Sequence, residues 1–293
     1  DYRKKITINP QNVTAGLSNF PMLFSRVDLE LRATTSSGYV ASSTGGDILF
    51  TDENHAKIPH EIEYYASTTG ELIAWVKVPF VSSTSTREIY IYYGNDTVPL
   101  ANQQDVTNVW NSNYIGVWHL KDGTTLNALD STSNANNGTI SNATAATSQV
   151  DGGGDFNGTS ALISTSDIAA IDSQGAISFS AWVKTDSTAG DKSITGKWDG
   201  TFGHFFQTGG STYGGGDDIA FGLDGNKFVY TTGNFISTGV WIHIVATFDD
   251  ALPGAANEEY RIYINAISRS LTSFFFQLGR LETKKLKLSY ISS

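Results

Sequence analysis

The chain has 293 residues, a formal net charge of −10 and no cysteine. A surface this acidic repels phosphate backbones, which argues against a nucleic-acid partner. The lack of cysteine excludes disulfides, cysteine-ligated metals and a cysteine nucleophile. No apolar stretch is long enough to span a bilayer, so we expect no membrane insertion of this segment. The length is sufficient for two domains of ordinary size.

The first 100 residues alternate apolar and polar side chains in short runs that end at turn-forming residues. This period of two predicts strands with one buried face, and it is clearest in residues 71–79 and 87–95. The only helix candidate is the short run 27–33. Together the runs predict five to seven strands, enough for one antiparallel sandwich. The remaining strand-like runs are residues 4–10, 20–24, 47–52 and 57–66.

Residues 60–65 read His-Glu-Ile-Glu-Tyr-Tyr, which invites interpretation as a metal site. The spacing is not that of the helical His-Glu-x-x-His motif, and the run lies in a predicted strand. In a strand, Glu61 and Glu63 share one face and His60 lies on the other. We therefore predict a solvated acidic face here and no metal site.

A second series of short strand-like runs begins at residue 114 and continues to about residue 266. So many short strands at regular spacing predict a larger, two-sheet jelly roll. Residues 98–113, between the two series, lack alternation and contain a proline, so we place the domain boundary there. The sequence thus predicts an all-β chain of two tandem β-sandwiches, with residues 1–110 in the first and 111–293 in the second.

Residues 130–139, DSTSNANNGT, follow the first predicted strand of the second domain and therefore form an internal loop, not a linker. Two interpretations stay open. Asx and Ser side chains cap turns by bonding to nearby backbone, which makes the loop structural. Calcium, in contrast, takes roughly six to eight oxygen ligands. Asp130, Asn134 and Asn136 supply several, and Asp151 or Asp155 completes the set.

Residues 197–225 combine aromatic side chains and carboxylates among glycines. Exposed rings stack on sugars and carboxylates accept hydrogen bonds from sugar hydroxyls, so this region is a candidate glycan site on a sheet face or rim loop. The alternative is that the strand aromatics pack the core and that the glycines form a long turn. The candidate ligand-binding residues are Trp198, Asp199, His204, Tyr213, Asp217 and Asp218.

Six motifs follow one another from residue 115 to about 266: GVWHL, DSTSNANNGTI, GGGDFNGTSALIS, ISFSAWVK, WIHIVATFD and RIYINA. In this order they resemble a concanavalin A-like, LamG-type jelly roll of bacterial and archaeal surface proteins. Such domains often bind calcium, which the resemblance implies for the loop at 130–139. After Ala266 the sequence departs from the family, because the usual acidic closing strand is missing and the tail is basic.

Residues 1 to about 110 contain YRKKITI, DILFTD, IPHEIEYY, LIAWVKVP and IYIYYGN. These motifs resemble a family catalogued as a domain of unknown function, family 2341. That family commonly precedes a LamG-type domain in secreted proteins, as it does here. The resemblance implies no established activity for this domain.

The sequence contains no pattern typical of catalysis. Glycoside hydrolysis usually needs two carboxylates across a cleft, and the Glu-x-Asp-x-(x)-Glu strand motif of the related glucanases does not occur. Glu61 and Glu63 lack a third carboxylate and lie in the other domain. A Gly-x-Ser-x-Gly nucleophile motif is also missing. We therefore expect that the chain is not an enzyme.

We expect a non-catalytic extracellular or cell-surface module, its signal peptide removed, that binds a glycan or surface polymer for adhesion, with calcium as a candidate cofactor. The alternative is a structural subunit of an extracellular fibre or surface layer that self-associates through its β-sandwiches. A polysaccharide-active enzyme is a distant third. Contacts between an acidic body and a basic tail suit self-association, although lysines also protect a solvated edge strand. The basic residues of the tail are Arg280, Lys284, Lys285 and Lys287.

Overall fold

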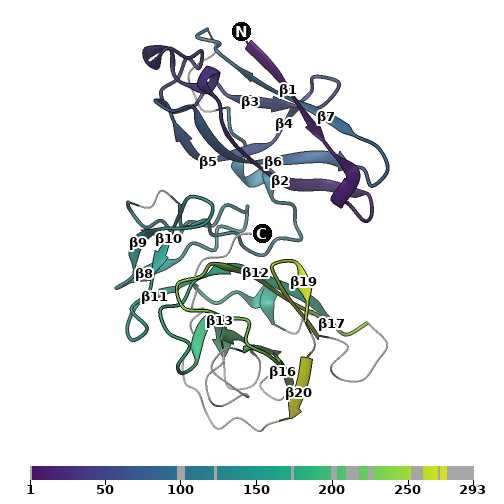
Figure 1. Cartoon of the computed structure of the whole chain (residues 1–293), viewed down its shortest axis with the longest axis vertical. Helices are drawn as coiled ribbons and strands as arrows, with labels where there is room; N and C mark the ends of the chain where they lie inside the picture. The colour runs from purple at the N-terminus through teal and green to yellow at the C-terminus, as the bar shows by residue number, and fades with distance from the viewer. Residues whose placement is uncertain are drawn as a thin grey trace. The chain divides into compact units, whose positions relative to one another are not determined.

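The computed structural model describes residues 2–97, 103–121, 124–172, 175–198, 203–208, 218–223, 227–251, 260–269 and 271–275. The chain divides into two compact units (Figure 1). The first comprises Asp1–Tyr114 with Ser131–Asn134, and the second Ile115–Asp130 with Ala135–Ser293. The boundary predicted from the sequence between the two domains lies after residue 110. Almost all regular structure in the described residues is antiparallel β, which confirms the predicted fold class.

The first unit is a sandwich of two antiparallel sheets, one ordered β1-β7-β3-β4 and the other β2-β6-β5. The predicted alternation is seen directly in β7, where Ile89, Ile91 and Tyr93 are buried and the residues between them are partly exposed. These side chains face the core that the two sheets share. The strands are β1 (Tyr2–Ile8), β2 (Leu17–Val27), β3 (Leu49–Thr51), β4 (Lys57–Ile58), β5 (His60–Ala66), β6 (Glu71–Val81) and β7 (Arg87–Tyr93).

The helix expected at residues 27–33 is a short 3-10 turn. Strand β2 continues to Val27, and the turn η2 spans only Leu29–Leu31. Its N-terminus is capped by Asp28, whose side chain accepts a hydrogen bond from the backbone N–H of Glu30 at 3.0 Å. Asp residues favour such caps over helix interiors. The other helical turns are η1 (Pro10–Asn12), η3 (Thr34–Ser36), α1 (Val106–Val109) and, in the second unit, η4 (Ala169–Ile171).

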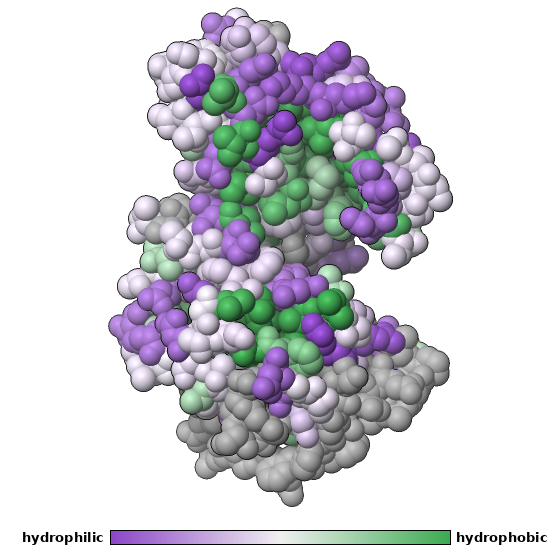
Figure 2. All heavy atoms as spheres, in the orientation of Figure 1, coloured by the Kyte–Doolittle hydropathy of each residue, from purple (hydrophilic) through white to green (hydrophobic). Residues whose placement is uncertain are grey.

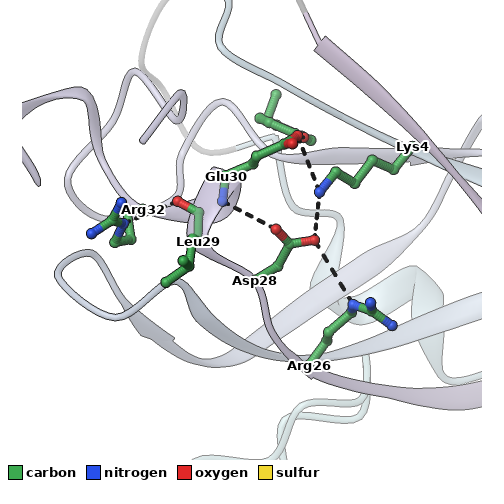
Figure 3. A network of polar contacts seen from close by, with 7 residues as sticks. Lys4, Arg26, Asp28, Leu29, Glu30 and Arg32 are labelled. Atoms are coloured by element: carbon green, nitrogen blue, oxygen red, sulfur yellow. Dashed lines mark hydrogen bonds and ion pairs between the residues drawn. The ribbon is translucent and has the colours of Figure 1, made fainter. Parts of the chain in front are cut away.

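The same aspartate anchors β1 to the end of β2 (Figure 3). Lys4 Nζ lies 2.6 Å from Asp28 Oδ2 and 3.1 Å from Glu30 Oε2, and Arg26 Nε lies 3.8 Å from the same Asp28 oxygen. Burial opposes the charged form of Asp28, but the Lys4 ion pair and the Glu30 N–H outweigh it and lower the pKa of the carboxyl. The network thus joins an edge strand of one sheet, β1, to an edge strand of the other, β2.

The edge strand β2 exposes four large apolar side chains. Figure 2 shows hydrophobic residues gathered on the visible face of the first unit. Two features limit pairing of this edge with another strand. Pro21 has no N–H to offer, and Asn19 has a left-handed φ of 52° and is not paired with β6, although the residues on both sides of it are. Both are devices that protect edges from aggregation. The exposed residues are Leu17, Phe20, Leu23 and Val27.

The acidic face predicted for residues 60–65 is not solvated, and that prediction is wrong. Glu61 is 1% exposed and Glu63 5% exposed. Glu61 accepts hydrogen bonds from Trp110 Nε1 at 3.1 Å and Ser131 Oγ at 2.8 Å, and Glu63 accepts one from Trp75 Nε1 at 2.5 Å. The segment around α1 packs against β5 and covers this face. Buried carboxylates persist where such donors satisfy them.

The second unit contains a four-stranded sheet, β12-β17-β18-β19, and a five-stranded sheet, β13-β14-β15-β16-β20. Two smaller sheets pair β8 with β11 and β9 with β10. The large sheets consist of β12 (Ala176–Val183), β13 (Lys192–Trp198), β14 (Gly203–Thr208), β15 (Ile219–Leu223), β16 (Lys227–Thr231), β17 (Ile242–Asp249), β18 (Tyr260–Ile264), β19 (Ile267–Ser268) and β20 (Leu271–Phe275). The small sheets consist of β8 (Thr139–Ser141), β9 (Thr144–Thr147), β10 (Gly152–Asp155) and β11 (Leu162–Ser164).

One core holds the two large sheets together. In β17, Ile242, Ile244 and Ala246 are buried in this core, alongside Phe206 and Phe221 from the other sheet. The residues that alternate with them in β17 are therefore turned to the outer face of the four-stranded sheet. That face is turned away from the core.

Candidate functional site

The loop at 130–138 is organised around the carboxylate of Asp130. This side chain is 8% exposed, and its two oxygens accept hydrogen bonds from Val117 N at 2.9 Å and Asn136 N at 2.8 Å. The backbone N–H of Asp130 in turn donates to Asn137 Oδ1 at 2.9 Å. This pattern supports the interpretation of the loop as turn chemistry, in which an Asx side chain replaces missing backbone partners.

The other residues predicted as calcium ligands are placed as follows. Asn134 donates through Nδ2 to the carbonyl of Tyr114 at 3.0 Å, and Asn136 donates to that of Ile115 at 2.8 Å. Asp155 is exposed at the end of β10. Within the described ranges, no three His, Cys, Asp or Glu side chains are grouped so as to hold a metal ion. Calcium also binds amide and backbone carbonyl oxygens, which this set of four residue types does not include, so calcium binding stays a prediction.

Two of the predicted glycan-binding residues are buried. His204 is 3% exposed, its ring stacks on Phe179 at 4.4 Å, and Nε2 lies 3.4 Å from Thr195 Oγ1. Burial, with a smaller contribution from the charge of Lys197, lowers the pKa of His204 to about 3, so the ring is neutral. His204 is thus a core residue of β14 and is not presented on the surface.

Asp218 is likewise buried, at 5% exposure. Its Oδ1 accepts a hydrogen bond from Gly233 N at 3.3 Å and lies 3.5 Å from Thr231 Oγ1, which ties the start of β15 to the end of β16. Trp198 ends β13, but its side chain lies outside the described part of the chain. Three further candidates lie wholly outside the described residues: Asp199, Tyr213 and Asp217.

The outer face of the four-stranded sheet carries an aromatic and polar set that the sequence prediction missed. We call it the aromatic face. It consists of three rows, one from each of β12, β17 and β18 and the residues that extend them. The rows are Ser178, Ser180, Trp182 and Lys184; Trp241, His243, Val245 and Thr247; and Arg261, Tyr263 and Asn265.

Cross-strand contacts fix the middle of this face. Trp182 pairs in register with His243, and their ring centroids lie 5.1 Å apart. Ser180 Oγ lies 2.9 Å from His243 Nε2, which fixes the orientation of the imidazole. On the other side of β17, Tyr263 is in register with Val245. Trp182, His243 and Tyr263 are all partly exposed, although Trp182 also packs against the core cluster.

One end of the aromatic face is formed by Lys184 and Trp241. The ammonium group of Lys184 lies 5.2 Å from the centroid of the Trp241 ring, a cation–π distance. Such a contact holds the indole in place while leaving part of its surface exposed. The face therefore presents flat apolar rings next to hydroxyl, imidazole and charged groups, which is the mixture that sugar recognition needs.

Two family models match the chain, and the first match extends past Tyr114 into the second unit. Residues 44–137 match the model described as Domain of unknown function (DUF2341), and residues 157–286 match the Concanavalin A-like lectin/glucanases superfamily. The second unit carries a concanavalin A-like jelly roll. Searches of curated proteins and of solved structures gave no match. The aromatic face lies wholly within the concanavalin A-like match.

Two further points bear on function. No helix among the described residues is long and apolar enough to cross a membrane. The matched superfamily is named for both lectins and glucanases, so the match itself leaves open whether this chain binds or cleaves sugars.

Proposed function

We propose that the chain is a non-catalytic, extracellular module that binds a polysaccharide through the aromatic face. The observation that carries the proposal is the placement of Trp182, Trp241 and Tyr263 beside polar side chains on the sheet face that the core does not use. Aromatic rings with one apolar and one polar aspect are suited to sugars, whose ring faces are apolar and whose edges carry hydroxyls. Adhesion to a glycan-coated surface follows from this activity.

Binding is thus assigned to the sheet face and not to residues 197–225, the glycan site predicted from the sequence. His204 and Asp218 are buried, whereas the aromatic face offers its side chains to solvent. Calcium, if bound at the loop 130–138, acts by holding that loop and not by contacting the sugar. The superfamily match is compatible with such a module.

The test is a binding screen of the whole chain against soluble polysaccharides, by affinity electrophoresis followed by calorimetry. Tyr263→Ala and Trp241→Ala should each weaken binding about two- to ten-fold, since a stacked ring contributes about 0.5–1.5 kcal/mol. Tyr39→Ala is the matched control, because Tyr39 is a 41% exposed aromatic residue of the first unit. Binding that survives both face variants would refute this site, and release of reducing ends during incubation would refute the non-catalytic assignment.

Self-association is the second candidate function, and the exposed apolar side chains of β2 favour it. Pro21 and the irregular Asn19 oppose strand addition along most of that edge. We therefore rank it below glycan binding. Light scattering across a range of concentrations decides the matter: growth of large particles that Leu23→Lys abolishes would favour a structural subunit.

A further inference from the structure

The charges on the aromatic face differ in sign from those of the chain as a whole. The chain carries a net charge of −10, yet the face presents the cations Lys184 and Arg261, both exposed. Among the described residues, neither has a carboxylate within ion-pair distance. Asp249, which continues the β17 row of the face two residues beyond Thr247, is the only acidic residue in the paired segments of β12, β17 and β18, and it accepts a hydrogen bond from Ala251 N at 3.0 Å. The described part of the face thus carries two cations and one carboxylate.

The spacing of the two cations sets the size of the ligand. Lys184 lies beside Trp241, and Arg261 is in register with Thr247. Trp241 and Thr247 are six residues apart along one strand, which corresponds to about 20 Å at the usual rise per residue. A single sugar cannot reach both ends. A linear polymer that runs along β17 can contact the two cations and the rings between them.

We propose that the aromatic face selects an acidic linear polysaccharide, one with carboxylates or sulfates on its sugars. This inference rests on the proposed function and specifies its ligand. Arg261 donates paired N–H groups to an anionic substituent at one end, and Lys184 supplies a point charge at the other. Between them, Tyr263 and Trp182 contact the apolar faces of the sugar rings. The net negative charge of the chain repels an acidic polymer, so binding of one requires local contacts of this kind.

The test compares polymers that share a backbone and differ in charge. Polygalacturonate is compared with its methyl ester, and dextran sulfate with dextran, by calorimetry on the whole chain at physiological ionic strength. At that ionic strength the Debye length is about 8 Å, so distant charges are screened and close pairs persist. We expect at least one acidic polymer to bind about ten-fold or more tightly than its neutral partner.

Protein variants tie the selectivity to the face. Arg261→Gln and Lys184→Gln should each weaken binding of the acidic polymer about ten-fold and leave weak binding of the neutral one unchanged. Arg26→Gln in the first unit is the matched control, because its side chain is also exposed, at 66%. Affinity for oligogalacturonates should rise with length until the ligand covers the span between the two cations, and then level off.

The outcomes separate this inference from the proposed function. Binding of polygalacturonate alone, or of dextran sulfate alone, supports the inference and identifies the acidic group. Equal affinity for acidic and neutral forms, or acidic binding unchanged by Arg261→Gln and Lys184→Gln, overturns the inference and leaves the glycan-binding function standing. No binding to any polysaccharide of the wider screen overturns both.

Discussion

Replacing Asp130 by alanine tests whether the loop at 130–138 depends on its carboxylate. The carboxylate accepts the backbone N–H groups of Val117 and Asn136 at 2.9 and 2.8 Å, in a position that is only 8% exposed. Alanine leaves both N–H groups without these acceptors. A buried donor that loses its partner costs about 1–3 kcal/mol, so we expect Asp130→Ala to lower the free energy of unfolding of the second unit by about 2–5 kcal/mol.

The assay is guanidinium unfolding of the whole chain, followed by tryptophan fluorescence. Trp118 reports on the loop, because its indole N–H donates to the carbonyl of Asn136 at 2.9 Å. The two units make separate transitions possible, so each is fitted on its own. Asp155→Ala is the control: this exposed residue ends β10, and its loss should change the free energy by less than about 0.5 kcal/mol.

The same measurement, made in calcium and in chelator, separates the two interpretations of the loop. A ligand that binds only the folded state raises stability by mass action. If calcium stabilises the native chain but not Asp130→Ala, the loop is a metal site as well as a turn. If calcium changes neither, turn chemistry is its whole role. A loss below about 0.5 kcal/mol for Asp130→Ala would contradict the reasoning from its hydrogen bonds.

Three other predictions concern buried or paired polar groups. Because its pKa is lowered from 3.8, Asp28 contributes stability above about pH 4 that is lost as the pH falls further; Asp28→Asn should flatten this acid limb in pH-dependent unfolding and cost about 1 kcal/mol at pH 7. Between pH 6.5 and 3, His204, whose pKa is about 3, takes up a proton only when the second unit unfolds. The free energy of unfolding should therefore decrease by up to about 1.4 kcal/mol for each unit by which the pH falls in this range, and His204→Gln should reduce that slope. Trp75→Phe removes the N–H that Glu63 accepts and should destabilise the first unit by about 2–3 kcal/mol in denaturant titrations, whereas an unchanged midpoint would show that another donor replaces it.

Alternation predicted the strands well because it reports a physical requirement of a two-layer fold. The runs at 71–79 and 87–95 became β6 and β7. In β7 the buried residues follow the period of two, whereas in β6 Ile73 and Trp75, on the other face, are buried as well. The run at 60–65 also became a strand, β5, but its acidic face is buried. Period alone assigns residues to faces but does not show whether another segment covers a face. Here the stretch around α1, which has no alternation of its own, brings Trp110 onto Glu61.

The aromatic face escaped the sequence prediction for a related reason. Around β17 both faces carry large side chains: Ile242 and Ile244 on one, Trp241 and His243 on the other. A pattern of this kind does not reveal which row fills the core. The region 197–225 was predicted as a site because aromatic side chains and carboxylates occur there among glycines, yet His204 is a buried residue. The available signal was the repeated pairing of an aromatic and a polar residue at alternate positions in three successive strand motifs.

The loop at 130–138 and the aromatic face should contribute independently, the first to stability and the second to binding. The hydrogen bonds of Asp130 join residues 117–137, whereas the aromatic face is built from residues 178–265. Sites that share no partners usually contribute independently. Asp130→Ala should therefore lower stability without changing the affinity of the remaining folded chain for a polymer, and Arg261→Gln should lower affinity without moving the unfolding midpoint. If Asp130→Ala instead abolished binding while the fold survived, the loop would belong to the recognition surface and the assignment of binding to the sheet alone would have to be abandoned.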